Sequence, residues 1–167
     1  RYLDMSRFIM EILHDFSPSI QQISIDEGFL DMTGTELLLG NPKIVAKNLK
    51  LEVLEKTGLT ISVGIGPSKF IAKMASAHCK PDGILQILSG QEIHFLDTCK
   101  IREIWGIGKK ASETLANKGI STVKQLRAFK RDTLCNFFGD SAGNYYYNAC
   151  RGIDPGIFSG KPKNRSI

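Results

Sequence analysis

The sequence predicts an α+β fold in which a ferredoxin-like layer of helices on an antiparallel sheet is followed by a small all-α part. Helical and strand patterns alternate up to about residue 98, and only short helical patterns punctuated by glycine follow. The charge changes at the same point. Residues 1–100 carry 10 basic and 12 acidic side chains, whereas residues 101–167 carry 12 basic and 5 acidic ones. We therefore expect two parts with different binding properties, the second of which faces a polyanion.

The composition narrows the class of protein. The 167 residues are 42% hydrophobic and 23% charged, with a net charge of +5, which is ordinary for a globular chain and excludes a disordered or collagen-like one. No apolar run approaches the ~18 residues that a membrane-spanning helix needs, so no membrane partner is expected. The four cysteines lack the spacing of a zinc site and are expected to be reduced thiols, as in a cytoplasmic protein.

The first elements are a helix and a hairpin. Apolar residues three or four positions apart predict a helix over residues 5–16, which Ser17-Pro18 ends. Two β-prone runs, residues 20–25 and 29–33, flank Asp26-Glu27-Gly28 and predict a hairpin with an acidic tip.

Two more helices and two more strands are expected before residue 98. Asn41-Pro42 opens a helix that Gly58 caps. A strand over residues 59–65 follows, then a helix that begins after Ser68 and ends before Lys80-Pro81. Residues 84–88 predict a last strand. Beyond them, residues 102–151 predict short helices broken at Gly106, Gly108, Gly119, Gly139 and Gly143.

Asp26 and Glu27 are the first candidates for chemistry. Neighbouring side chains of a regular strand point to opposite faces, but at a hairpin tip both carboxylates can reach one hard cation such as Mg²⁺. A solvated polar turn is the alternative, and a two-metal site needs more than two carboxylates. Asp31 lies nearby and is interpreted as structural.

A lysine stripe is the second candidate. At about 100° per residue, one face of the helix expected after residue 68 carries Lys69, Lys73, Ser76 and Lys80. The opposite face carries Ile71, Met74, Ala75 and His78. Such a stripe is most often a solvated face. This one follows the turn Gly66-Pro67-Ser68, where helix N–H groups are suited to anions, which favours a polyphosphate or a nucleic-acid backbone.

The third candidate is Trp105-Gly106-Ile107-Gly108, an apolar-glycine repeat between two helical segments. Glycines let a backbone approach a phosphate closely, as in a helix-hairpin-helix module, and Lys109 and Lys110 add charge directly after them. A plain turn between helices is the alternative. Residues 139–143 are a candidate for a second, weaker hairpin of the same kind.

Together these segments resemble the Y-family lesion-bypass DNA polymerases, closest to the bacterial polymerase IV type. Four stretches carry the resemblance: the family's acidic palm motif at residues 24–31, its nucleotide- and primer-side segment at 59–83, and the start and end of its thumb at 104–108 and 138–154.

The resemblance implies a template-directed DNA polymerase of the translesion, error-prone class, which serves DNA repair and damage tolerance by two-metal nucleotidyl transfer. Asp26 and Glu27 would be the catalytic residues that bind two Mg²⁺ ions, and Lys80 would steady the deoxynucleoside triphosphate. The backbone of primer-template DNA would be held by Gly66, Ser68, Lys69, Lys73, Gly106, Gly108, Lys109 and Lys110. A monovalent cation at the thumb hairpin is a further expectation.

The resemblance also implies a domain plan. Residues 1–98 would be a partial palm, residues 99–153 a helix-hairpin-helix thumb, and residues 154–167 a linker towards a further DNA-binding domain. The family's palm has another strand with a metal-binding aspartate, and no segment of this sequence matches it. We therefore expect this chain alone to be inactive. The complete enzyme is expected to be a cytoplasmic monomer that contacts a sliding clamp through other regions.

Two other classes of function stay open. One is a non-catalytic helix-hairpin-helix DNA-binding module, and the other is an inactive scaffold that recruits repair partners. Asp26-Glu27 and the lysine stripe distinguish them from the enzyme, because a module that only binds DNA needs neither.

Overall fold

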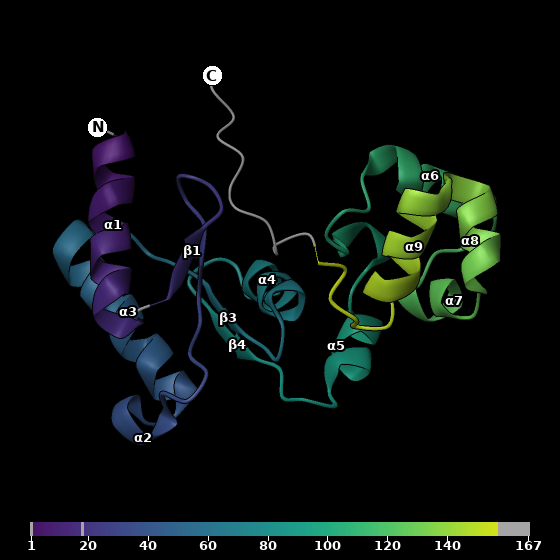
Figure 1. Cartoon of the computed structure of the whole chain (residues 1–167). Helices are drawn as coiled ribbons and strands as arrows, with labels where there is room; N and C mark the ends of the chain where they lie inside the picture. Colours follow the sequence, from purple (N-terminus) through teal and green to yellow (C-terminus); the bar gives the residue numbers. More distant parts are fainter. Residues whose placement is uncertain (1, 18, 157–167) are drawn as a thin grey trace. The chain divides into compact units, whose positions relative to one another are not determined.

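The chain forms two compact units in a computed structural model that describes residues 2–17 and 19–156 (Figure 1). Within these residues, unit 1 comprises residues 2–65 and 76–86, and unit 2 comprises residues 66–75 and 87–156. The α+β class is confirmed. The boundary at residues 98 and 99 stays a prediction, and most of the expected linker at 154–167 lies outside the described residues.

Unit 1 is built on two long helices. Helix α1 (Tyr2–Phe16) packs against α3 (Pro42–Thr57), as Figure 1 shows. Their shared core contains Ile12, Leu13, Leu49 and Val53. The Asn41 side chain accepts a hydrogen bond from the Lys43 N–H at 2.9 Å and so caps the start of α3. Gly58 ends α3 in the left-handed region with φ 70°, as its place in the sequence predicts.

The predicted hairpin is present, with shorter strands. Strands β1 (Ile20–Gln22) and β2 (Gly28–Leu30) pair in antiparallel fashion. Pairing stops early because the N–H groups of Ile23 and Ser24 both turn to the Glu27 carbonyl, at 2.9 and 3.3 Å. Residues 23–27 therefore form a closed loop, and the last three residues of the first predicted strand, 23–25, belong to this loop.

A second pair of strands departs from the antiparallel sheet that the sequence predicts. Strands β3 (Val63–Ile65) and β4 (Ile84–Gln86) run parallel. Parallel strands need a crossover connection, and helix α4 (Lys69–His78) provides it. Within residues 2–17 and 19–156 the two pairs form separate two-stranded sheets.

Unit 2 contains the short helices predicted after residue 101. They are η1 (Ile101–Glu103), α6 (Lys109–Asn117), α7 (Val123–Arg127), α8 (Arg131–Phe138) and α9 (Asp140–Ala149). Helices α8 and α9 lie side by side, because Gly143 lets α9 come so near that a Cβ there would collide with the backbone of Cys135.

The sequence does not predict two of the helices, α2 (Glu36–Leu39) and α5 (Glu92–Thr98). Helix α5 belongs to unit 2, where Phe95 and Leu96 are buried and Asp97 pairs with Arg127. Cys79, Cys99, Cys135 and Cys150 are all free thiols. Among the described helices, none has the length and apolar character needed to cross a membrane.

Candidate functional site

The acidic pair lies on the closed loop of unit 1 between β1 and β2. Asp26 is exposed, Glu27 is half-buried, and the Ser24 hydroxyl donates a hydrogen bond to Asp26 Oδ1 at 2.5 Å. The loop breaks the strand alternation, so the two neighbouring carboxylates are not committed to opposite faces of a sheet. Two carboxylates near solvent leave room for water and phosphate oxygens, which is the coordination that Mg²⁺ favours.

Lys80 lies in the same unit as the acidic loop but not on the helical stripe. Helix α4 ends at His78, and Lys80 is an exposed residue of the turn that follows. The prediction that Lys80 continues the stripe of Lys69 and Lys73 is therefore wrong. His78, expected on the face of the helix opposite the lysines, is exposed.

The turn that carries Lys80 is braced from α3. Lys50, only 14% exposed, forms an ion pair with Asp82 and also donates a hydrogen bond to the Ile61 carbonyl. Gly83 follows directly and allows the turn to close, because a Cβ there would collide with the Cys79 carbonyl. The position of Lys80 thus depends on a charge pair between residues 32 positions apart.

The start of α4 lies in unit 2 and is built around Gly66 and Ser68. A Cβ on Gly66 would lie 2.8 Å from Ile71 Cγ2, so this position requires glycine. Ser68 Oγ accepts a hydrogen bond from the Ile71 N–H at 3.3 Å.

The Asp154 carboxylate also accepts a hydrogen bond from the first turn of α4, from the Phe70 N–H at 3.3 Å. The sequence predicts that this helix start is open to an external anion. In the structure, one N–H group of this helix start already donates a hydrogen bond to a carboxylate of the protein itself. Lys69, the first residue of α4, is exposed, and Lys73, one turn later, is half-buried.

The glycine hairpin between η1 and α6 is held by two hydrogen bonds of the Trp105 backbone. Its N–H donates to Met74 Sδ at 3.2 Å, and its carbonyl accepts a hydrogen bond from the Tyr145 hydroxyl. Gly106 has φ +89°, and a Cβ there would lie 2.5 Å from Tyr145 Cε1. The hairpin therefore requires glycine at position 106 for two reasons.

Gly108 is the N-cap residue directly before α6, and it leaves this end of the helix open. Its φ is −74°, no side chain caps the helix, and a Cβ added to it would meet nothing within 4 Å. The first four N–H groups of an α-helix lack partners within the helix, and Lys109 and Lys110 are both exposed beside them. This end of α6 combines accessible N–H groups with positive charge, as a phosphate site requires.

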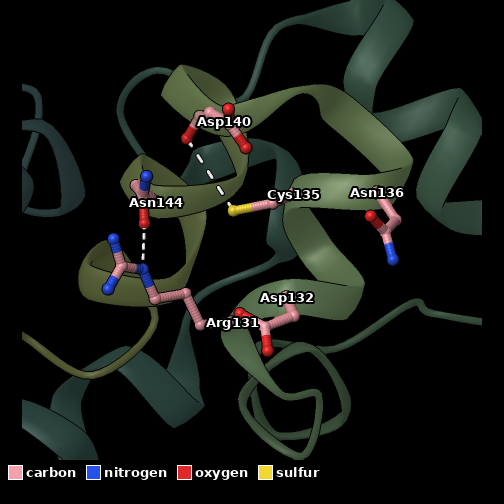
Figure 2. A pocket seen from close by; sticks show the side chains of 6 residues that line it. All are labelled: Arg131, Asp132, Cys135, Asn136, Asp140 and Asn144. Atoms are coloured by element: carbon pink, nitrogen blue, oxygen red, sulfur yellow. Dashed lines mark hydrogen bonds between the residues drawn. The ribbon is translucent and has the colours of Figure 1, made fainter.

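The second candidate hairpin, between α8 and α9, has a different character. Figure 2 shows a hollow at this place, lined by Arg131, Asp132, Cys135, Asn136, Asp140 and Asn144. Arg131 points to Asn144 and donates a hydrogen bond to it through Nε. Asp140 begins α9, so a carboxylate stands where a phosphate would bind at the first hairpin. The hairpin between η1 and α6 is therefore the better candidate for a backbone contact.

Part of the positive charge after residue 100 is structural. Arg127 Nε donates to the Cys150 carbonyl at 2.7 Å, and its NH2 group lies 2.7 Å from Asp97 Oδ1. That ion pair lowers the pKa of the Asp97 carboxyl. Arg151 stacks 3.6 Å from the Tyr147 ring centroid and donates to the Arg127 carbonyl. The charge count alone could not separate these side chains from those that can face a polyanion.

The predicted site residues are thus divided between the units. Asp26, Glu27 and Lys80 lie in unit 1, and Gly66, Ser68, Lys69, Lys73, Gly106, Gly108, Lys109 and Lys110 lie in unit 2. Sequence reasoning missed Lys50, Asp154 and Tyr145, which support these residues through contacts distant in sequence.

Two family models match the chain. The impB/mucB/samB family matches residues 1–77, and the thumb domain of DNA polymerase-iota matches residues 102–154. Among curated proteins, DNA polymerase IV of Treponema denticola is 41% identical over 167 residues, which are 100% of this chain and 42% of that protein. The chain thus spans less than half the length of this relative.

The chain is also similar to solved structures of DNA polymerases. DinB from Sulfolobus solfataricus has a TM-score of 0.79 and 30% identity, and the match covers 90% of this chain and 44% of that one. The insertion ternary complex of Dbh DNA polymerase has the same TM-score, identity and coverage. The resemblance that the sequence motifs carry is therefore confirmed.

Proposed function

The chain belongs to the impB/mucB/samB family of Y-family polymerases, of the polymerase IV type, and we propose that it forms the catalytic loop and the DNA-holding helices of a template-directed DNA polymerase. The observation that carries this proposal is the exposed loop with Asp26 and Glu27, in a segment that the family model matches. The activity belongs to the longer polymerase that contains this chain. Single-nucleotide extension of a primer by that polymerase tests it, and absence of extension with every nucleotide would contradict it.

Asp26 and Glu27 would hold Mg²⁺ through their carboxylate oxygens. The donors fit, since both are oxygen ligands on a short loop near solvent. The chemistry that bound Mg²⁺ supplies is activation of the primer 3′-hydroxyl and neutralisation of charge on the leaving pyrophosphate. The Ser24 hydroxyl orients the Asp26 carboxylate, which leaves its other oxygen available to a metal.

Lys80 would bind the triphosphate of the incoming deoxynucleotide. Its side chain is exposed, and the turn that carries it is fixed by the contacts of Lys50 with Asp82 and the Ile61 carbonyl. A fixed turn reduces the entropy that Lys80 loses when it binds phosphate.

Replacing Lys50 by Met should raise the KM for the nucleotide about tenfold, because the turn loses a charged hydrogen bond worth ~1.5 kcal/mol or more. The rate at saturating nucleotide should change little. Steady-state kinetics of single-nucleotide incorporation measures both. Lys56→Met is the matched control, since Lys56 lies on the same helix and pairs only at the surface with Glu52. An unchanged KM in Lys50→Met would contradict the proposal that Lys50 holds the turn that carries Lys80.

The hairpin and the start of α6 would hold the backbone of primer-template DNA. Gly106 and Gly108 shape the backbone, and Lys109 and Lys110 add attraction that does not depend on base sequence. Lys69 and Lys73 on α4 would add further backbone contacts. Contacts of this kind do not inspect the base pair, which suits synthesis past damaged bases.

The affinity for primer-template DNA should fall steeply as salt rises. Replacing Lys109 and Lys110 together by Ala should lower the slope of log affinity against log salt concentration by about 1.8, since each phosphate that a lysine neutralises adds ~0.9 to the slope. Fluorescence anisotropy over a series of salt concentrations measures the slope. An affinity of the unaltered protein that does not respond to salt would contradict the proposed binding of the DNA backbone.

Other features of the proposed enzyme follow from the family. A monovalent cation would assist the hairpin in binding phosphate, and a sliding clamp would be contacted through regions outside this chain. The enzyme would act as a monomer in the cytoplasm, in DNA repair and damage tolerance. A non-catalytic DNA-binding module is the alternative, and it predicts DNA binding without incorporation of nucleotide.

A further inference from the structure

We infer that Tyr145 is a positioning residue for DNA binding, which holds the Trp105–Gly108 hairpin in the geometry that receives a phosphate. The inference rests on the proposed function, because it assigns a role within the same DNA contact. Tyr145 itself would not touch DNA. It would act through the backbone of Trp105 and Gly106.

Two contacts connect Tyr145 to the hairpin. Its hydroxyl donates a hydrogen bond to the Trp105 carbonyl. Its ring fills the space beside Gly106, where an added Cβ would lie 2.5 Å from Cε1 and 2.6 Å from Cζ. One side chain of α9 therefore fixes both the carbonyl that precedes Gly106 and the position of Gly106 itself.

Tyr145 is in turn held by the packing of α8 and α9. Its ring meets Tyr146 edge to face, with 5.7 Å between ring centroids, and Tyr146 meets Phe138 in the same way at 5.0 Å. Gly143 brings the two helices together. The hairpin is thus braced against a closely packed helix pair, and a rigid support is what precise placement of binding groups needs.

The hydroxyl is suited to donate over the whole physiological pH range. Burial, and to a smaller extent the neighbouring Tyr146 and Asp154, raise the pKa of Tyr145 well above its ordinary value. Tyr145 therefore stays neutral and keeps its proton for the Trp105 carbonyl.

The consequence for binding is pre-organisation. With the Trp105 N–H directed to Met74 Sδ and its carbonyl to Tyr145, both peptide groups of the residue before Gly106 are fixed. The N–H groups at the start of α6 follow a few residues later in one short turn. A hairpin that is already in its binding geometry loses less conformational entropy when it binds DNA. If the hairpin adopts this geometry only part of the time, its apparent affinity for DNA falls in proportion to that fraction of time.

Tyr145→Phe tests the inference, because it removes the hydroxyl and keeps the ring beside Gly106. In the longer polymerase, we expect this variant to bind primer-template DNA about fivefold more weakly at a temperature where it is fully folded. The salt slope should stay unchanged, since the phosphate contacts are the same in number. Incorporation at saturating DNA should also stay unchanged, and hydrogen exchange at the hairpin amides should become faster.

Tyr147→Phe is the matched control. Tyr147 lies on the same helix, its ring stacks on Arg151, and the ring survives the substitution. We expect unaltered affinity and unaltered exchange at the hairpin. Equal affinity of Tyr145→Phe and the unaltered protein, or equal losses in both tyrosine variants, would overturn the inference and leave the proposed function intact. Failure of the unaltered protein to bind primer-template DNA would overturn both.

Discussion

Asp26→Ala is expected to lower nucleotide incorporation by about 10³-fold or more, since it removes a carboxylate that would hold Mg²⁺ and with it several kcal/mol of transition-state stabilisation. The substitution should leave the fold intact. Asp26 is exposed, and the Ser24 hydroxyl that donates to it can turn to water instead. Single-turnover incorporation by the longer polymerase measures the effect, with DNA binding measured in parallel without nucleotide.

Asp31→Ala is the control for this prediction. Asp31 is also an exposed carboxylate near β2, and its Oδ1 accepts a hydrogen bond from the Thr33 N–H at 3.0 Å, as a turn residue does. We expect near-normal incorporation and a small loss of stability. Normal turnover by Asp26→Ala would show that the metal ligands lie elsewhere. Loss of DNA binding in Asp26→Ala would mean that the loop has a structural role.

The second large effect is expected for Gly106→Ala. The new methyl group would stand 2.5 Å from the Tyr145 ring, in a backbone with φ +89° that disfavours any side chain. Backbone strain and overpacking each cost roughly 1–3 kcal/mol, so the free energy of unfolding of unit 2 should fall by about 3 kcal/mol. Denaturant unfolding followed by circular dichroism measures this decrease.

Gly108→Ala separates stability from binding. The space around Gly108 is open and its φ is −74°, so the free energy of unfolding of this variant should lie within ~0.5 kcal/mol of that of the unaltered protein. Its DNA affinity should nevertheless decrease, because the methyl group stands where a phosphate must approach the start of α6. If Gly106→Ala proves as stable as Gly108→Ala, the close packing of Tyr145 against the hairpin is wrong.

Local patterns in the sequence predict those features that local interactions determine. The acidic hairpin tip, the Asn41 and Gly58 caps of α3 and the glycine hairpin before α6 all depend on residues a few positions apart, which is the range that patterning and capping rules cover. The same rules place Asp26 and Glu27 on the loop, and the lysines after Gly108 at the helix start, where the structure has them.

The predictions that were wrong or incomplete concern residues whose positions depend on contacts distant in the sequence. Lys80 departs from the stripe because α4 ends at His78, and Lys50 binds its turn from 32 positions before Asp82. Arg127 pairs with Asp97 and donates a hydrogen bond to the Cys150 carbonyl at the end of α9. A charge count nevertheless assigns this side chain to the surface that faces a polyanion. No local pattern contains these pairs, because they depend on which helices the fold brings together.

The Asp154 cap of α4 has a consequence for how the protein is made. The Phe70 N–H receives its partner from a residue 84 positions later. At ribosomal rates of about 5–20 residues per second, this carboxylate is synthesised roughly 4–17 s after Phe70. The described segments of unit 1 are complete by residue 86, whereas residues 66–75 must wait for the helices after residue 87. During translation the start of α4 therefore lacks this hydrogen bond until the end of unit 2 has left the ribosome.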